Sequence, residues 1–88
     1  MKHKFYNIRG KRCAKLGELD AAISFYEKAI FIKPEYVEAH YNLGLANHKL
    51  GLLDAAVTGY KKVVTLKPEY ALINKNKILS VIYFFSKG

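Results

Sequence analysis

Two stretches of the chain, at about 20–33 and 54–67, carry apolar residues three or four positions apart. In the first they are Ala22, Ile23, Tyr26, Ala29 and Ile30, and in the second they are Ala56, Val57, Tyr60, Val63 and Val64. Side chains with this spacing lie along one side of an α-helix, and the strict alternation of a β-strand is missing. The pattern therefore predicts two amphipathic helices.

Two glycines predict where two further helices end. Gly17 and Gly51 each follow a Lys-Leu pair, and a glycine commonly stands just beyond the last turn of a helix. The helices that they close lie at about 4–16 and 38–50. Each precedes one of the amphipathic helices by a short link, so the chain should form two helical hairpins.

Aspartates and prolines predict the bounds of the amphipathic helices. Asp20 and Asp54 stand where a helix start needs a side-chain acceptor, so we expect them to be N-caps. Pro34 and Pro68 follow the two helices. A proline cannot continue a helix because it lacks the backbone N–H and its ring clashes with the preceding turn.

The chain repeats itself with a period of 34 residues. When residues 3–36 are set against residues 37–70 without a gap, 14 of the 34 positions are identical. The identical pairs include Gly10/Gly44, Gly17/Gly51, Asp20/Asp54, Ala22/Ala56, Tyr26/Tyr60 and Pro34/Pro68. Chance would give far fewer identities, so the sequence contains a duplicated unit of two helices.

Each unit resembles the tetratricopeptide repeat (TPR), a 34-residue pair of antiparallel helices. The second unit carries the pattern of this family at His40, Leu43, Gly44, Asn47, Ala56, Tyr60 and Pro68, and the first carries it at Tyr6, Gly10, Cys13, Ala22, Tyr26 and Pro34. The resemblance covers about residues 3–70. It implies an all-α fold in which antiparallel hairpins stack as a short right-handed superhelix with a terminal fifth helix.

Several positions depart from the family pattern. Arg9 stands where the family prefers leucine, and Cys13 and Asn47 stand where it prefers an aromatic residue. His40 replaces a large first residue, and Gly59 lies inside a predicted helix. These departures predict either a loosened first helix or a partner that packs where the aromatic side chain of the family would lie.

We expect a single TPR domain over residues 1–88, with repeat one at 3–36, repeat two at 37–70 and a capping or interface helix at 71–86. The last segment is apolar on almost every side, as in a helix that is buried on more than one face. Candidates for self-association, as a homodimer through this segment, are Ile78, Val81, Ile82, Phe84 and Phe85. A truncated repeat array would leave the same surface open.

The net charge of +8 is concentrated at the two ends of the chain. Residues 1–17 carry six Lys and Arg residues and no acid, and residues 70–88 carry three Lys and no acid. Such a surface attracts acidic peptides, nucleic acid or anionic lipid. Nucleic acid is the less favoured partner because no recognition helix or stacking platform is visible.

The resemblance implies that the first helices of the repeats line a concave groove for a partner. The groove residues that it implies are Lys4, Asn7, Lys11, Lys15, Tyr41, Asn42, Leu45, His48, Lys49, Lys75 and Asn76. Two binding modes of the family use such positions, a clamp for a terminal carboxylate and an asparagine ladder along a peptide backbone. Amides pair with peptide bonds and lysines select acidic groups, so the expected function is protein–protein interaction through an acidic peptide. The alternative is a self-associating structural scaffold.

No group of residues points to catalysis, a cofactor or a metal ion. His40 and His48 are eight residues apart on one helix, too far to bind one ion, and Cys13 is the single cysteine. We therefore expect no enzyme activity. The longest apolar run, at 81–85, is far shorter than the ~20 residues of a membrane span, and no secretory signal is visible, so the expected location is cytoplasmic.

Overall fold

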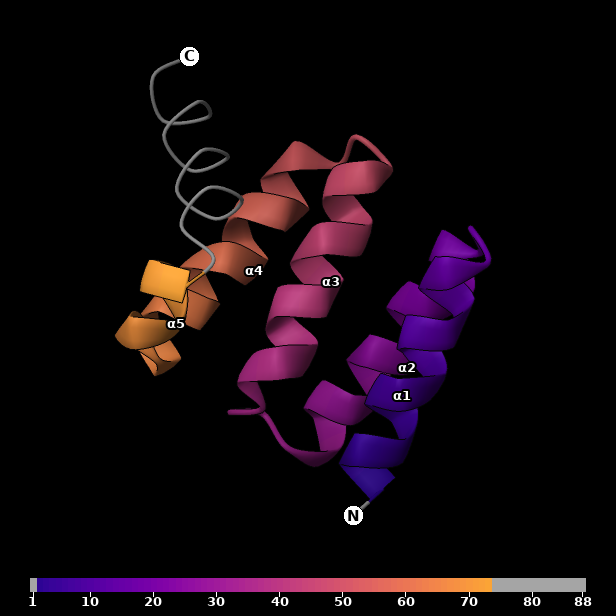
Figure 1. Ribbon diagram of the computed structural model, residues 1–88, viewed down its shortest axis with the longest axis horizontal. Coiled ribbons are helices and arrows are strands. Elements are labelled where there is room, and N and C mark those ends of the chain that lie inside the picture. Colours follow the sequence, from indigo (N-terminus) through magenta and orange to yellow (C-terminus); the bar gives the residue numbers. More distant parts are fainter. Residues whose placement is uncertain (1, 74–88) are drawn as a thin grey trace.

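The computed structural model describes residues 2–73, and this part of the chain forms five α-helices and no strand (Figure 1). The helices are α1 (Lys2–Lys15), α2 (Leu19–Ile32), α3 (Val37–Lys49), α4 (Leu53–Leu66) and α5 (Pro68–Ile73). The predicted all-α fold of helical hairpins is confirmed, and the four long helices lie within about two residues of the ranges expected from the sequence.

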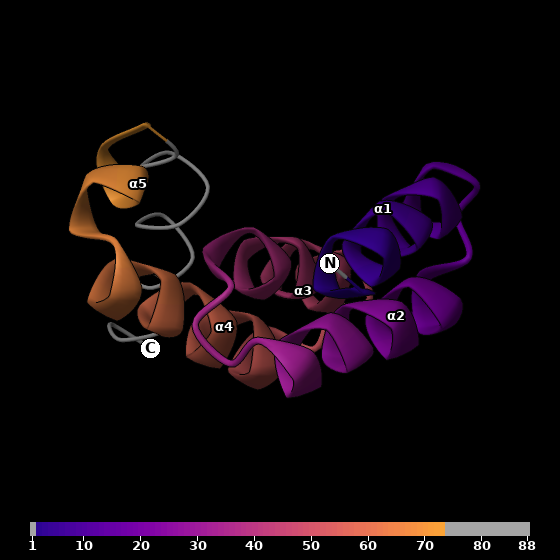
Figure 2. The same cartoon turned by 90° about the horizontal axis from the view of Figure 1, so that it is seen from below.

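The helices form two layers (Figure 2). One layer holds α1, α3 and α5, and the other holds α2 and α4. Each helix packs mainly against its neighbour in the chain, α1 on α2, α2 on α3, α3 on α4 and α4 on α5. Figure 2 also shows that α1 and α5 rise on either side of α3, so the layer of α1, α3 and α5 forms the inner, curved face of the stack.

The turns within both hairpins have the same structure. Gly17 and Gly51 both have a φ of +79°, a left-handed conformation in which a side chain is disfavoured. Beyond each glycine, the backbone N–H of the next residue donates to a carbonyl of the last helical turn, Glu18 to Cys13 at 2.9 Å and Leu52 to Asn47 at 2.9 Å. These bonds complete a Schellman motif, and the predicted helix ends are confirmed.

The N-cap prediction for the two aspartates was wrong. The caps of α2 and α4 are Glu18 and Leu52, and neither makes a side-chain cap hydrogen bond. Because the chain re-enters a helix immediately after the glycine turn, Asp20 and Asp54 fall inside the first helical turn. Their negative charges still stabilise the helix starts through the helix dipole.

The Lys-Pro-Glu-Tyr segments after α2 and α4 form equivalent turns. The N–H of Tyr36 donates to the carbonyl of Lys33 at 3.0 Å, and the N–H of Tyr70 donates to that of Lys67 at 2.9 Å. The second turn is the start of α5, so the fifth helix begins at Pro68 and not at residue 71 as the sequence suggests. A proline is well tolerated at a first helical position because its missing N–H has no partner there.

The sequence predictions for the far end of the chain fall beyond the described part. They concern the groove residues Lys75 and Asn76 and the self-association residues Ile78, Val81, Ile82, Phe84 and Phe85.

The core of each hairpin pairs a glycine on the first helix with a tyrosine on the second. A Cβ atom at position 10 would lie 2.5 Å from Cε1 of Tyr26, and one at position 44 would lie 2.6 Å from Cε1 of Tyr60. Tyr26 and Tyr60 are almost completely buried. The absence of a side chain on α1 and α3 at these points therefore lets the tyrosine rings fill the space between the helices.

Candidate functional site

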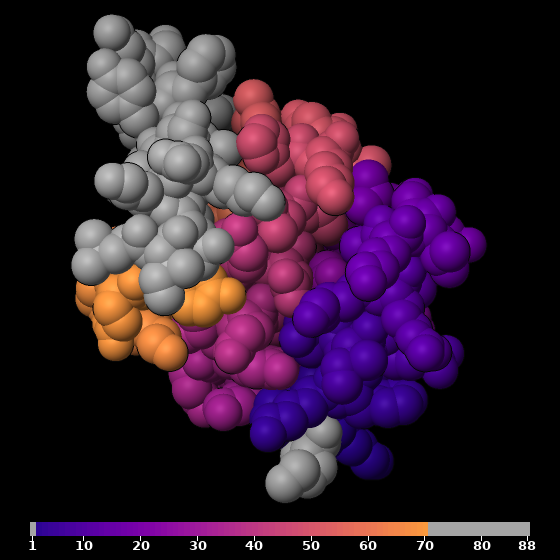
Figure 3. Space-filling model, in the orientation of Figure 1, coloured from indigo at the N-terminus to yellow at the C-terminus, as the bar shows by residue number. Residues whose placement is uncertain are grey.

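The inner face carries a hollow of about 160 Å³ between α1 and α3, which we call the inner groove. Figure 3 shows this face, with α1 beside α3. Five residues expected in a binding groove line the hollow together, Lys11, Lys15, Asn42, Leu45 and Lys49. Tyr26 of α2 also lines it. The groove thus combines basic, amide and apolar surface.

The amide of Asn42 is held in place by a second asparagine. Asn42 Nδ2 donates to Oδ1 of Asn7 at 3.0 Å, and Asn7 Nδ2 donates to the hydroxyl oxygen of Tyr36 at 3.4 Å. This chain of bonds links α1, α3 and the turn between the two hairpins. Asn42 uses one N–H in it, which leaves its second N–H and its carbonyl oxygen for another partner.

Asn7 lies beneath the groove surface. It is only 6% exposed, and its Oδ1 and Nδ2 atoms are both engaged. Burial raises the pKa of Tyr36, and Glu38 raises it further, whereas the hydrogen bond from Asn7 lowers it. The structure therefore gives Asn7 a supporting position, in which it orients Asn42.

The lysines of the inner groove carry unpaired charge. Lys11, Lys15 and Lys49 are exposed, and within residues 2–73 none of them forms an ion pair with a carboxylate. Exposed ammonium groups gathered along one hollow raise the local concentration of anionic groups. Lys4 and His48 are also exposed, but they do not line the hollow.

Tyr41 lies in the core of repeat two. It is buried, and its ring centroid lies 6.0 Å from that of Tyr60 and 5.4 Å from that of Tyr70. Burial raises the pKa of Tyr41. Tyr70, at the start of α5, thus packs on α3 through Tyr41 just as Tyr36 contacts α1 through Asn7.

A second hollow lies on the outer face, where none of the groove residues expected from the sequence lies but where His40, Asn47 and Gly59, three of the departures from the family pattern, line the surface. It occupies about 700 Å³ between α2 and α4, with α3 behind it, and we call it the outer groove. The signal for it lies in the comparison of the two repeats. Tyr6 and Phe25 of repeat one correspond to His40 and Gly59 of repeat two, so on this surface one phenol ring gives way to a smaller imidazole and one phenyl ring is lost.

The described residues do not assemble a metal site. No three His, Cys, Asp or Glu side chains between residues 2 and 73 gather so that they could hold a metal ion. Cys13 is a free, half-buried thiol. In the same part of the chain, no helix has the length and apolar character needed to cross a membrane.

Comparisons with known proteins identify the family. A family model described as TPR repeat matches residues 10–51, and one described as tetratricopeptide repeat matches residues 37–70. Together they cover the two hairpins from Gly10 to Tyr70. A comparison with curated proteins finds no match. The family matches, the duplicated hairpins and their glycine–tyrosine packing agree, and the chain belongs to the tetratricopeptide repeat family.

Proposed function

We propose that this protein is a non-catalytic interaction module whose inner groove binds an acidic peptide segment of a partner protein. Tetratricopeptide repeats generally mediate protein–protein interactions and are typically non-catalytic. The family therefore accounts for a protein partner, and the residues of the inner groove support the chemistry of the segment that it recognises.

The observation that carries the proposal is the position of Asn42 among three lysines. Asn42 lies in the same hollow as Lys11, Lys15 and Lys49, and the bond to Asn7 fixes its side chain. An amide that is already oriented loses little conformational entropy when it binds. Its free N–H and carbonyl oxygen match the carbonyl and N–H of one peptide bond.

The lysines supply selectivity for acidic groups. A carboxylate beside an ammonium group makes a charge-assisted hydrogen bond, but each exposed pair contributes only about 0.2–1 kcal/mol. Three lysines and one asparagine therefore support modest affinity. Electrostatic attraction of this kind mainly favours the approach and selection of an acidic partner, so binding should weaken as the salt concentration rises.

Titration of acidic peptides into the full chain, each prepared as a free acid and as a C-terminal amide, tests the proposal. We expect the Asn42→Ala and Lys11→Glu variants to lose at least tenfold in affinity. Lys67→Glu makes the same change of charge at an exposed lysine outside the groove, and this control should bind nearly as the unchanged protein does.

Two results would contradict the proposal. One is that no acidic peptide binds, and the other is that binding is indifferent to Asn42 and Lys11. The comparison of acid with amide shows whether the groove grips a terminal carboxylate or an internal acidic segment. Sedimentation of each variant, alone and with peptide, separates loss of peptide binding from any change in self-association.

A further inference from the structure

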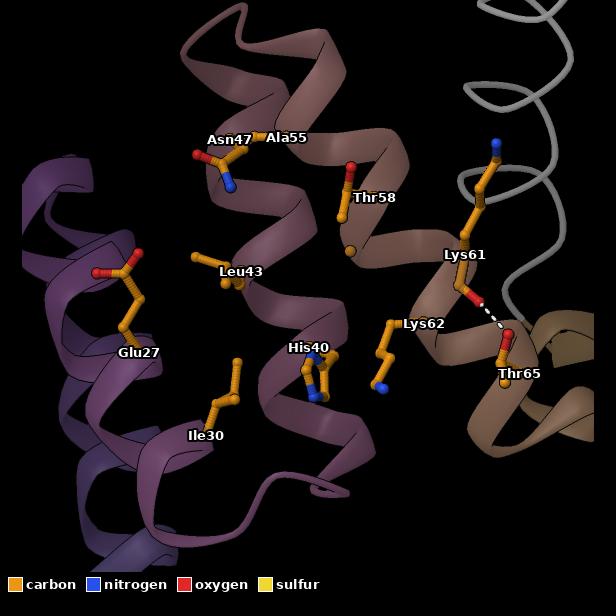
Figure 4. A pocket seen from close by; sticks show the side chains of 11 residues that line it. Glu27, Ile30, His40, Leu43, Asn47, Ala55, Thr58, Lys61, Lys62 and Thr65 are labelled. Atoms are coloured by element: carbon orange, nitrogen blue, oxygen red, sulfur yellow. Dashed lines mark hydrogen bonds between the residues drawn. The ribbon is translucent and has the colours of Figure 1, made fainter.

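The outer groove offers a binding surface opposite the inner groove. Figure 4 shows it between α2 and α4, with α3 in the middle. Its volume of about 700 Å³ lies within the range of about 300–1,000 Å³ that is usual for ligand sites. Ile30 and Leu43 line it with apolar surface, and Gly59 leaves the wall of α4 without a side chain. The groove is therefore large enough for more than one side chain of a partner.

An amide side chain with no hydrogen bond to the described residues faces this space. Asn47 is 8% exposed, and its side chain makes no hydrogen bond within residues 2–73. In Figure 4 its carboxamide projects from α3 towards α2, into the outer groove. Tyr60 Oη is the one side-chain polar atom of the described residues that is buried without a partner, so the Asn47 amide is open to solvent and able to donate to or accept from a bound group.

The first repeat shows what can occupy the corresponding space. There, Tyr6 and Phe25 stack with their ring centroids 6.2 Å apart. In repeat two the equivalent residues are His40 and Gly59. The ring of His40 does not replace them, because its Nε2 atom lies 2.7 Å from the carbonyl oxygen of Pro34. The same fold thus holds two rings on one repeat and an open groove on the other.

The charged residues around the outer groove favour a particular charge on a bound segment. Lys61 and Lys62 of α4 line the groove, are exposed and form no ion pair within the described residues. Glu27 lines the opposite wall, on α2. A negative group bound in the groove is therefore attracted to the α4 side and repelled from the α2 side, which would orient a bound segment.

We propose that the outer groove binds a segment of a partner protein that inserts an aromatic side chain beside Asn47 and places an acidic residue against Lys62. A tyrosine fits this description best, since its ring replaces the phenyl ring missing from repeat two and its hydroxyl can pair with the amide of Asn47. This site is independent of the inner groove, and a partner could engage both faces of the stack.

The probe for the test is the blocked tripeptide N-acetyl-Asp-Tyr-Asp-amide, titrated into the isotope-labelled full chain and followed by NMR. We expect saturable shifts of the Asn47 side-chain amide signals. The same tripeptide with alanine in place of tyrosine should bind at least tenfold more weakly. The blocked ends remove the terminal carboxylate that the inner groove could grip.

Matched variants locate the site. Thr58→Trp fills the groove from an exposed position on α4 and should reduce the affinity at least tenfold. Ser24→Trp makes a similar change at the equivalent exposed position of repeat one and should leave the affinity unchanged. Thermal unfolding of both tryptophan variants checks that they remain folded.

The proposal is overturned if the Asn47 signals do not move, or if the alanine tripeptide binds as tightly as the tyrosine tripeptide. It is also overturned if a folded Thr58→Trp variant binds normally. Loss of binding in Asn42→Ala with full binding in Thr58→Trp would assign the tripeptide to the inner groove, which would support the first proposal and reject this one.

Discussion

Gly44 lies so close to the ring of Tyr60 that a Cβ atom on it would come within 2.6 Å of Cε1 and 2.8 Å of Cδ1. The ring belongs to a tyrosine with no exposed surface, so it has little room to move away. The glycine is thus a packing requirement of the hairpin formed by α3 and α4, and Gly10 meets the same requirement against Tyr26 in the first hairpin.

We therefore expect Gly44→Ala to destabilise the fold. Alanine favours a helix over glycine by about 1 kcal/mol, but overpacking of a core costs about 1–3 kcal/mol, so a net loss should appear in denaturant unfolding. In a Tyr60→Leu background the same change should cost less, because the ring is gone. A Gly44→Ala variant more stable than the unchanged protein would show that the helices separate easily.

The hydroxyl of Tyr60 provides a second prediction. This oxygen is buried and has no hydrogen-bond partner among the described residues. Because an unsatisfied buried polar group costs about 1–3 kcal/mol, Tyr60→Phe should leave the free energy of unfolding unchanged or raise it. Tyr36→Phe is the matched control, since it removes a hydroxyl that accepts a bond from Asn7. That variant should be about 1 kcal/mol less stable.

Tyr26 and Tyr60 should lose their hydroxyl protons at a higher pH than a free tyrosine does. Burial raises the pKa of Tyr26 from 10.0 to about 12, and the Cys13 thiol contributes to this shift. Burial also raises the pKa of Tyr60 from 10.0 to about 12, and Tyr41 contributes to that shift. Below pH 10 both residues are protonated whether the chain is folded or unfolded, so the folded state keeps its full stability. As the pH rises from 10 to 12, only the unfolded chain releases these protons, and stability is lost.

Absorbance of the tyrosinate ion as a function of pH measures the ionisation of the tyrosine hydroxyls directly. The folded chain should show a late step near pH 12 from Tyr26 and Tyr60, and the step should be missing in denaturant. A Tyr60→Phe variant should lose about half of it. Titration of every tyrosine near pH 10 in a chain that is still folded would contradict the burial of these two rings.

Asn7 and Asn42 should differ in their effects, because Asn7 stabilises the fold and orients Asn42, whereas Asn42 is proposed to contact the peptide. Asn7 is buried and bonded on both sides, so Asn7→Ala should lower the free energy of unfolding by about 1–2 kcal/mol and also weaken binding of acidic peptides. Asn42→Ala should weaken binding with a smaller effect on stability, because Asn42 is only half-buried. Equal effects of the two variants on stability and on affinity would contradict this division.

The sequence predicted the helices closely because the signals at their ends are local. Gly17 and Gly51 adopt a conformation that suits glycine, and Pro34 and Pro68 lack the N–H that a continuing helix needs. The Asp20 prediction was wrong because the cap depends on how soon the chain re-enters a helix after the glycine. That distance is set by the turn as a whole and not by the residue type at one position.

The site could be predicted only in part. Helical spacing puts Asn7 on the same side of α1 as Lys4 and Lys11, yet Asn7 is buried whereas both lysines are exposed. The difference comes from Tyr36 and Asn42, which approach Asn7 from elsewhere in the chain. Burial that depends on contacts between distant segments is not contained in the periodicity of a single helix.

The stacking of each helix on its neighbour in the chain has a kinetic consequence. Since α1 meets α2, α2 meets α3 and α3 meets α4, the helices that pack on each other are neighbours in the chain, and little loop-closure entropy is lost before packing begins. A helical chain with such local contacts should fold within microseconds to milliseconds. Either hairpin can nucleate the process, so the second copy of the repeat provides the protein with an alternative starting point for its own folding.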